Sequence, residues 1–241
     1  MATVLIEFFG MPGCGKTFIA KNLAEALRDE GCIISDRMRT LTEKPRLSRI
    51  IEKVGLILRC LILDKKVFSM SLAFIIKFID FRSVGWIKVF FNWLYIVALI
   101  EVESRKVDII LLDQGIGQAI WSTLFYGNKT SQSRTSNQWL EDFLAVLSID
   151  ILHIVNLHAD NKLIEKRIHN RVRGSSPLDG GQQNNWQQAS QALTDTQELI
   201  KQLDETTSYC YVQDITNNSD GLDINLIDKI KEAVLIESVQ V

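Results

Sequence analysis

Three glycines, a lysine and a threonine fall within eight residues near the N-terminus, at a spacing that could bind phosphate. The segment reads Gly10-Met-Pro-Gly-Cys-Gly-Lys-Thr17. Glycines leave room for backbone N–H groups to surround a phosphate, and a helix that begins here adds partial positive charge. Lys16 could reach the β- and γ-phosphates of a nucleotide, and the Thr17 hydroxyl could ligate Mg²⁺. The predicted nucleotide contacts are Gly10, Met11, Pro12, Gly13, Cys14, Gly15, Lys16, Thr17 and Phe18.

The residues on either side of this loop predict the elements that such a motif requires. Residues 4–9 form an apolar run with the length of a buried strand. After the loop, Ile19, Leu23 and Leu27 recur at i, i+4 and i+8, which predicts an amphipathic helix that stops near Gly31. Strand, glycine loop and helix in this order distinguish a phosphate-binding loop from a chance match.

Charged residues also follow two further predicted strands, 32–35 and 107–113. Ligands of parallel α/β sheets bind at the carboxyl ends of the strands. Asp36 could orient or deprotonate an attacking hydroxyl, and Arg37 or Arg39 could hold a phosphate or carboxylate; a solvated loop is the alternative. Asp113 ends a run of aliphatic residues and could hold Mg²⁺ or contact the acceptor.

A third group of candidates follows the fourth predicted strand, residues 151–157. Arg167 and Arg171 are four residues apart on one predicted helix, and Arg173 lies at the edge of a glycine-rich loop. We expect residues 167–185 to form a lid whose arginines neutralise charge on a transferring phosphoryl group. The alternative is a basic, solvated helix end.

The segment 46–106 is unusually apolar for its position between the second and third strands. Residues 46–63 carry apolar side chains at helical spacing, and 67–81 and 83–100 are apolar and aromatic. The last of these approaches membrane-spanning length, but Lys88 and Asn92 interrupt it. We expect buried helices that form the wall of an acceptor site or a subunit interface, so a homodimer through 46–100 is one possible partner. Membrane-surface association or a lipid-like acceptor is the alternative.

The remaining pattern completes an alternation of strands and helices, which predicts an α/β fold and a single domain over residues 1–241. The polar loop 214–221 follows a strand predicted at 209–212 and could lie beside a nucleotide base. Further helices are predicted near 116–125, 137–147, 186–203 and 223–236.

Composition excludes several classes of protein. The net charge of −2 over 241 residues does not favour a nucleic-acid polymer as partner. Four scattered cysteines form no C-x-x-C pair, so neither a disulfide framework nor a zinc site is expected. The N-terminus has no basic region followed by an apolar segment, so we expect no secretory signal and a cytoplasmic location, with membrane association as the alternative.

The chain resembles the P-loop kinases of nucleosides and nucleotides, above all the thymidylate-kinase-like group. The resemblance rests on GMPGCGKT at 10–17, Asp36-Arg37, ILLDQG at 110–115 and EKRIHNRVRG at 165–174. It implies a three-layer fold with a five-stranded parallel sheet in the order 2-3-1-4-5, a helical acceptor region after the second strand and a lid after the fourth. It also implies transfer of the γ-phosphoryl group of ATP with Mg²⁺.

Two departures from this family affect the acceptor side. Gln114 occupies the position where the family has an arginine that grips the acceptor, and the Arg-Glu-Pro motif after the second strand is absent. The sequence therefore predicts a phosphotransferase that moves the γ-phosphoryl of ATP to a hydroxyl or phosphate of a small molecule, without naming that molecule. The alternative is a regulatory ATPase that docks a protein or a membrane through 46–100.

Overall fold

The computed structural model describes residues 2–79, 81, 85–126, 137–170, 183–219, 221 and 223–239. Its centre is a sheet of five parallel strands in the order β2-β3-β1-β4-β5. The strands are β1 (Val4–Phe9), β2 (Ile34–Ser35), β3 (Ile109–Leu112), β4 (Ile151–His158) and β5 (Cys210–Thr216). The α/β class and the strand order are those expected from the sequence.

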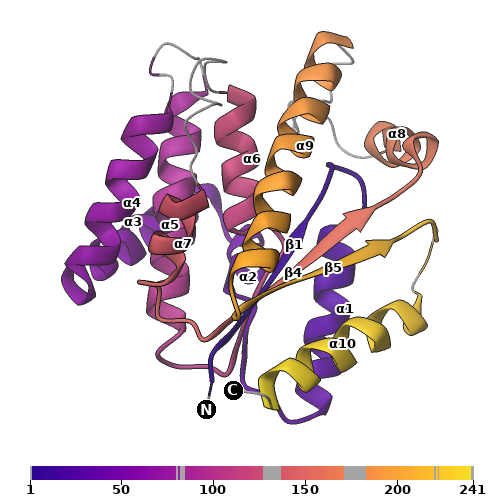
Figure 1. The fold of residues 1–241 in the computed structure, drawn as a ribbon, viewed down its shortest axis with the longest axis horizontal. Coiled ribbons are helices and arrows are strands. Elements are labelled where there is room, and N and C mark those ends of the chain that lie inside the picture. The colour runs from indigo at the N-terminus through magenta and orange to yellow at the C-terminus, as the bar shows by residue number, and fades with distance from the viewer. Residues whose placement is uncertain are drawn as a thin grey trace.

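Helices cover both faces of this sheet (Figure 1). Helices α1 (Lys16–Asp29) and α10 (Ile224–Val239) lie on one face. The other face is covered by α5 (Trp86–Glu103), α6 (Ile116–Tyr126), α7 (Asn137–Leu144) and α9 (Gln183–Thr206). The described chain also forms α2 (Arg37–Thr42), α3 (Arg46–Leu63), α4 (Lys65–Phe78) and α8 (Asn161–Asn170).

The central strand β1 distributes its side chains between two cores. Val4, Ile6 and Phe8 pack with α1 and α10, whereas Leu5 and Phe9 pack on the side of α5 and α6. Successive side chains of a strand point to opposite faces, so an all-apolar strand is buried on both. Glu7 is the one charged residue of this strand, and it is fully buried on the α6 side.

Several element boundaries differ by a few residues from those expected, among them the ends of β5 and α5. Strand β5 continues through Thr216, four residues beyond the predicted end, because residues up to that position pair with β4 as far as His158. Helix α5 runs to Glu103, so the two acids Glu101 and Glu103 lie inside it rather than after it. The extension of β5 follows from its pairing with β4, which local pattern does not contain.

Within this single chain, the expected burial of the 46–100 segment is found for α5, whereas the apolar row of α3 is exposed. Residues 93–103 of α5 are all buried. Helix α3 has the predicted bounds, but its apolar row faces solvent, with Leu47 70 % and Ile51 65 % exposed. Its inward face is built instead around Leu56 and Cys60. Among the described residues, no helix is both long and apolar enough to cross a bilayer.

Candidate active site

The loop between β1 and α1 has the backbone shape that its glycines permit. Gly10, Gly13 and Gly15 have φ values of +142°, +94° and +104°. A Cβ atom on Gly10 would lie 2.3 Å from the carbonyl oxygen of Leu157, and one on Gly15 would lie 2.4 Å from Nδ2 of Asn217. Side chains are therefore excluded at both positions. The predicted order of strand, loop and helix is present, while phosphate binding itself stays a prediction.

Lys16 lies over this loop and is 8 % exposed. Its ammonium group donates to the carbonyl oxygens of Gly10 at 2.6 Å and Met11 at 3.0 Å. These are neutral acceptors, which compensate a buried ammonium less well than an anion does. An arriving phosphate would therefore compete well for the lysine.

Thr17 and Asp113, from α1 and from the end of β3, meet as the sequence predicts for two metal ligands. The Thr17 hydroxyl donates to Oδ2 of Asp113 at 2.7 Å. Mg²⁺ prefers oxygen ligands and usually takes only one or two of them from the protein. The described residues contain no cluster of three or more His, Cys, Asp or Glu side chains suited to a metal. A hydroxyl and one carboxylate thus fit Mg²⁺ bound together with phosphates.

Asp36 lies next to that pair. It lines a gap of about 10 Å³ together with Thr17, Asp113 and Arg39. Burial by itself raises the pKa of Asp36, but hydrogen bonds from Arg39 at 2.7 Å and Arg28 at 3.0 Å outweigh it and lower that pKa. An aspartate held ionised in this way can orient a hydroxyl, but it is a weak base while both arginines are bound.

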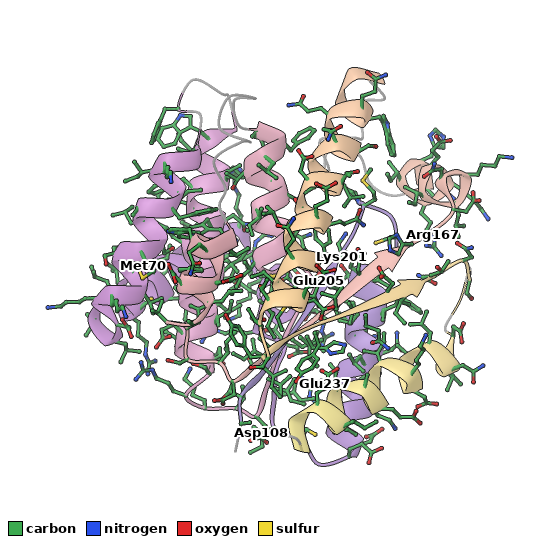
Figure 2. All side chains as sticks on the ribbon, viewed as in Figure 1. Met70, Asp108, Arg167, Lys201, Glu205 and Glu237 are labelled. Atoms are coloured by element: carbon green, nitrogen blue, oxygen red, sulfur yellow. The ribbon has the colours of Figure 1, made fainter. Side chains whose placement is uncertain are left out.

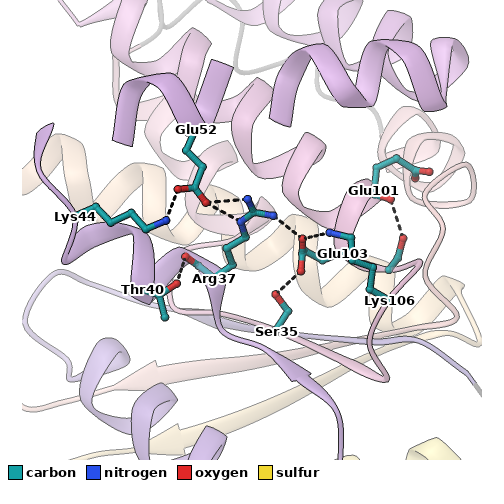
Figure 3. Close-up of polar contacts among 9 residues, drawn as sticks. Ser35, Arg37, Thr40, Lys44, Glu52, Glu101, Glu103 and Lys106 are labelled. Atoms are coloured by element: carbon teal, nitrogen blue, oxygen red, sulfur yellow. Dashed lines mark hydrogen bonds and ion pairs between the residues drawn. The ribbon is translucent and has the colours of Figure 1, made fainter. Parts of the chain in front are cut away.

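Arg37, which was expected as a possible contact to a phosphate or carboxylate of the ligand, forms ion pairs within the protein. Its guanidinium donates to Glu52 of α3 at 2.8 Å and to Glu103 of α5 at 2.8 Å, and Figure 3 shows it between the two. Glu103 also accepts from Ser35 at 3.0 Å. Arg37 is not among the described residues that line the main cavity. The structure therefore gives it a bracing position among α2, α3 and α5.

Arg167 comes from α8 and reaches the phosphate-binding loop, on the side of the helix that faces the sheet (Figure 2). Its Nη1 lies 3.3 Å from the carbonyl oxygen of Gly13, and its Nη2 donates to the carbonyl of Ser219. Asn217 donates to the carbonyl of Cys14 at 2.8 Å. The loop after β5 is thereby tied to the phosphate-binding loop, as expected if it borders a nucleotide. Arg171, Arg173 and most of the predicted lid lie outside the described residues.

A cavity of about 510 Å³ opens beside the phosphate-binding loop. It is lined by residues of that loop with Arg167, Asn217, Ser219 and Gly221, and also by residues of α5 and α6. The described residues that line it are Pro12, Gly13, Gly15, Lys16, Thr17, Phe18, Lys88, Val89, Asn92, Gln114, Gln118, Trp121, Ser122, Tyr126, Arg167, Asn217, Ser219 and Gly221.

The segment 46–100 was expected to form the wall of an acceptor site, but the individual residues of α5 and α6 that line this cavity were not assigned from the sequence. Lys88 and Asn92 are four residues apart on α5, and Gln118 and Ser122 are four residues apart on α6. Each pair therefore lies on one face of a predominantly apolar helix. That spacing was the available signal, because a polar i, i+4 pair in a buried helix requires a polar surface to face. Gln114 also lines the cavity and is exposed.

Glu7 joins β1 to the start of α6 beneath this wall. Its Oε1 accepts from the backbone N–H of Gln118 at 3.2 Å, and a Cβ on Gly115 would lie 2.5 Å from its carboxyl carbon. Burial raises the pKa of Glu7 to about 7, against a smaller lowering by the N–H groups of Gln118, Gly117 and Ile116. Its Oε2 has no hydrogen-bond partner among the described residues. The carboxyl group thus fixes where α6 begins.

Comparison with known proteins adds a distant likeness to solved structures. No protein-family model matches the chain, and no curated protein matches its sequence. Among solved structures, a thymidylate kinase from Ehrlichia chaffeensis is similar over 98 % of both chains, with 14 % sequence identity and a TM-score of 0.42. This likeness concerns the course of the chain, so a function has to be argued from the site.

Proposed function

We propose that this chain is an ATP-dependent phosphotransferase that moves the γ-phosphoryl group of ATP to a hydroxyl or phosphate of a small molecule. One observation carries the proposal. A single cavity of about 510 Å³ is lined both by the glycine loop between β1 and α1 and by polar residues of α5 and α6. This volume lies within the range of small-molecule sites, and the arrangement lets donor and acceptor lie side by side.

The proposed roles follow from position and charge. Lys16, Arg167 and the N–H groups of residues 10–18 hold the phosphates, and Lys16 leaves the carbonyls of Gly10 and Met11 to do so. Thr17 and Asp113 hold Mg²⁺, which when bound neutralises charge on the β- and γ-phosphates. Asp36 orients the acceptor oxygen. Arg171 and Arg173 remain proposed contacts to the transferring group, with no position to support them.

The acceptor is proposed to bind against α5 and α6. Lys88 supplies positive charge, and Asn92, Gln114 and Gln118 supply amide donors and acceptors. Trp121 adds an aromatic surface in the same wall. These groups favour a compact polar acceptor with an anionic group. We further propose that residues 1–241 act as one domain, with the acceptor wall supplied by the segment between β2 and β3 together with α6.

ATP turnover by the purified protein with Mg²⁺ tests this proposal. The acceptor panel should contain nucleosides, nucleoside monophosphates, sugars and polyprenols. We expect turnover that depends on one acceptor class and falls about a hundredfold or more in Lys16→Ala. Lys21→Ala is the matched control, because Lys21 is an exposed lysine on the same helix. Tight ATP binding without turnover on any acceptor would contradict the proposal.

The exposed apolar row of α3 favours a regulatory ATPase as second candidate. Such a protein would hydrolyse ATP slowly without an acceptor and would bind another protein or a membrane through α3. The same experiment separates the two candidates, because only the second predicts acceptor-independent turnover that is lost in Lys16→Ala.

A further inference from the structure

Helix α3 presents an apolar surface to solvent, which we call the α3 outer face. Apolar side chains recur on this face every three or four residues along the 18 residues, or about 27 Å, of the helix. Exposed fractions run from 38 % to 77 %. Single exposed apolar side chains are ordinary, but a contiguous row of this size marks a surface that meets something else. Its members are Leu47, Ile50, Ile51, Val54, Leu58, Leu61 and Ile62.

The helix is held in this orientation by polar contacts on its inner face. Glu52 accepts from Arg37 at 2.8 Å, and the ammonium group of Lys53 lies 4.2 Å from the centre of the Tyr95 ring. Leu56 and Cys60 are buried on the same side. Turning the apolar row inward would break these contacts and expose two buried residues. The exposure of the outer face is therefore a consequence of specific pairing.

The charges around the outer face are of one sign. Within 46–66 the exposed charged residues are Arg46, Arg59, Lys65 and Lys66. The two acids of this stretch are occupied elsewhere: Glu52 binds Arg37 and Lys44, and Asp64 accepts from the N–H of Val67 at the start of α4. These four cations lie along a segment of a chain whose net charge is −2. The complement of these cations and the apolar row is a surface that is anionic outside and apolar beneath.

We propose that the α3 outer face docks on the surface of an anionic lipid bilayer. The apolar row would enter the boundary between headgroups and acyl chains, while the arginines and lysines reach lipid phosphates. A second copy of this chain fits less well. In a two-fold antiparallel contact, Arg46 of one copy would approach Lys65 and Lys66 of the other, and 46–66 offers no acid to pair with them.

Co-sedimentation of the full-length protein with lipid vesicles tests this proposal. Vesicles of phosphatidylcholine with phosphatidylserine should bind the protein, and vesicles of phosphatidylcholine alone should bind it much less. Ile51→Glu should lower binding at least about tenfold, since it places a charge in the apolar row. Ile224→Glu on α10 is the matched control, because Ile51 and Ile224 are both 65 % exposed. It should leave binding unchanged.

A second variant tests the electrostatic part without touching the apolar row. Lys65→Gln with Lys66→Gln should weaken binding to the anionic vesicles about thirtyfold, because two cations that attract the anionic lipid are removed. Added salt should act in the same direction. ATP turnover of all these variants should equal that of the unaltered protein, because none of the altered residues lines the cavity.

Two outcomes would overturn the proposal. One is vesicle binding that is absent, or that is the same with and without anionic lipid. The other is a dimer in sedimentation velocity without lipid, dissociated by Ile51→Glu, together with no vesicle binding; the outer face would then be an interface between copies. Either result would leave the proposed phosphotransfer untouched, since that is measured separately on soluble acceptors.

Discussion

At the scale of single residues, Glu7 is the clearest case of a group whose role the sequence did not indicate. It stands in the strand that leads to the glycine loop 10–17, yet its carboxyl group binds the first turn of α6, which carries part of the proposed acceptor wall. A buried carboxyl with one oxygen unpartnered among the described residues is costly when ionised. Its protonation should therefore be visible in the stability of the protein.

We expect Glu7→Gln to change how stability depends on pH. The pKa of Glu7 is about 7 in the folded protein against 4.5 for an ordinary glutamate, so the folded state binds this proton more tightly. The contribution of this proton to the free energy of unfolding is fully present below pH 4.5 and is lost as the pH rises through 7. The glutamine cannot ionise, so above pH 7 the variant should gain on the order of 3 kcal/mol over the unaltered protein.

Urea unfolding of both proteins over this pH range is the measurement. The difference between them isolates Glu7 from Asp36, Glu52 and Glu103, whose lowered pKa values act in the opposite direction in both proteins. A difference that stays constant with pH would contradict the assignment.

At the scale of elements, the helices between β2 and β3 are held together by ion pairs between side chains as well as by apolar packing. Arg37 of α2 links Glu52 of α3 to Glu103 of α5 (Figure 3). Glu103 is 9 % exposed, so removal of its partner leaves a nearly buried charge with less compensation. The brace thus sets how α3 lies against α5, and through α5 it supports the acceptor wall.

Arg37→Met should lower the free energy of unfolding by about 1–3 kcal/mol. The methionine keeps an apolar stem but leaves Glu103 without its arginine. The double variant with Glu103→Gln should recover part of the loss, because it removes a nearly buried carboxylate that keeps only Lys106 as an ion-pair partner. Urea unfolding measures both. Unchanged stability with a raised KM for the acceptor would instead support the acceptor contact expected from the sequence.

At the scale of the whole molecule, nucleotide binding should couple to folding. The loop 10–17, Arg167 of α8 and the segment after β5 come from distant parts of the chain and meet only in the folded state. A ligand that binds only the folded protein stabilises it by about 2.7 kcal/mol at a hundredfold excess over Kd. For a chain of this size, that corresponds to a rise in Tm of about 5–10 °C.

Thermal unfolding with and without ATP and Mg²⁺ checks this expectation. The rise should persist in Lys21→Ala and disappear in Lys16→Ala. It should shrink when Mg²⁺ is removed by a chelator, because the ion that we propose Thr17 and Asp113 share with the phosphates is then absent. An equal rise in Lys16→Ala would remove this loop from nucleotide binding.

Much of the fold could be predicted from the sequence because it depends on local sequence patterns. The apolar run 4–9, the glycines of the loop and the row Ile19, Leu23 and Leu27 each depend on neighbours a few residues away. Alternation of strands and helices then limits the topology to a parallel sheet. The meeting of Thr17 with Asp113 followed as well, since the carboxyl ends of neighbouring parallel strands share one edge.

Other features were decided only by tertiary structure. Periodicity identified an apolar row on α3, but a period defines a face without saying which way it points. Arg37 was placed by Glu52 and Glu103, 15 and 66 residues away. The pairs Lys88–Asn92 and Gln118–Ser122 became one wall only when α5 packed on α6. A local sequence determines what an element is, whereas long-range charge pairing and burial determine what each of its faces meets.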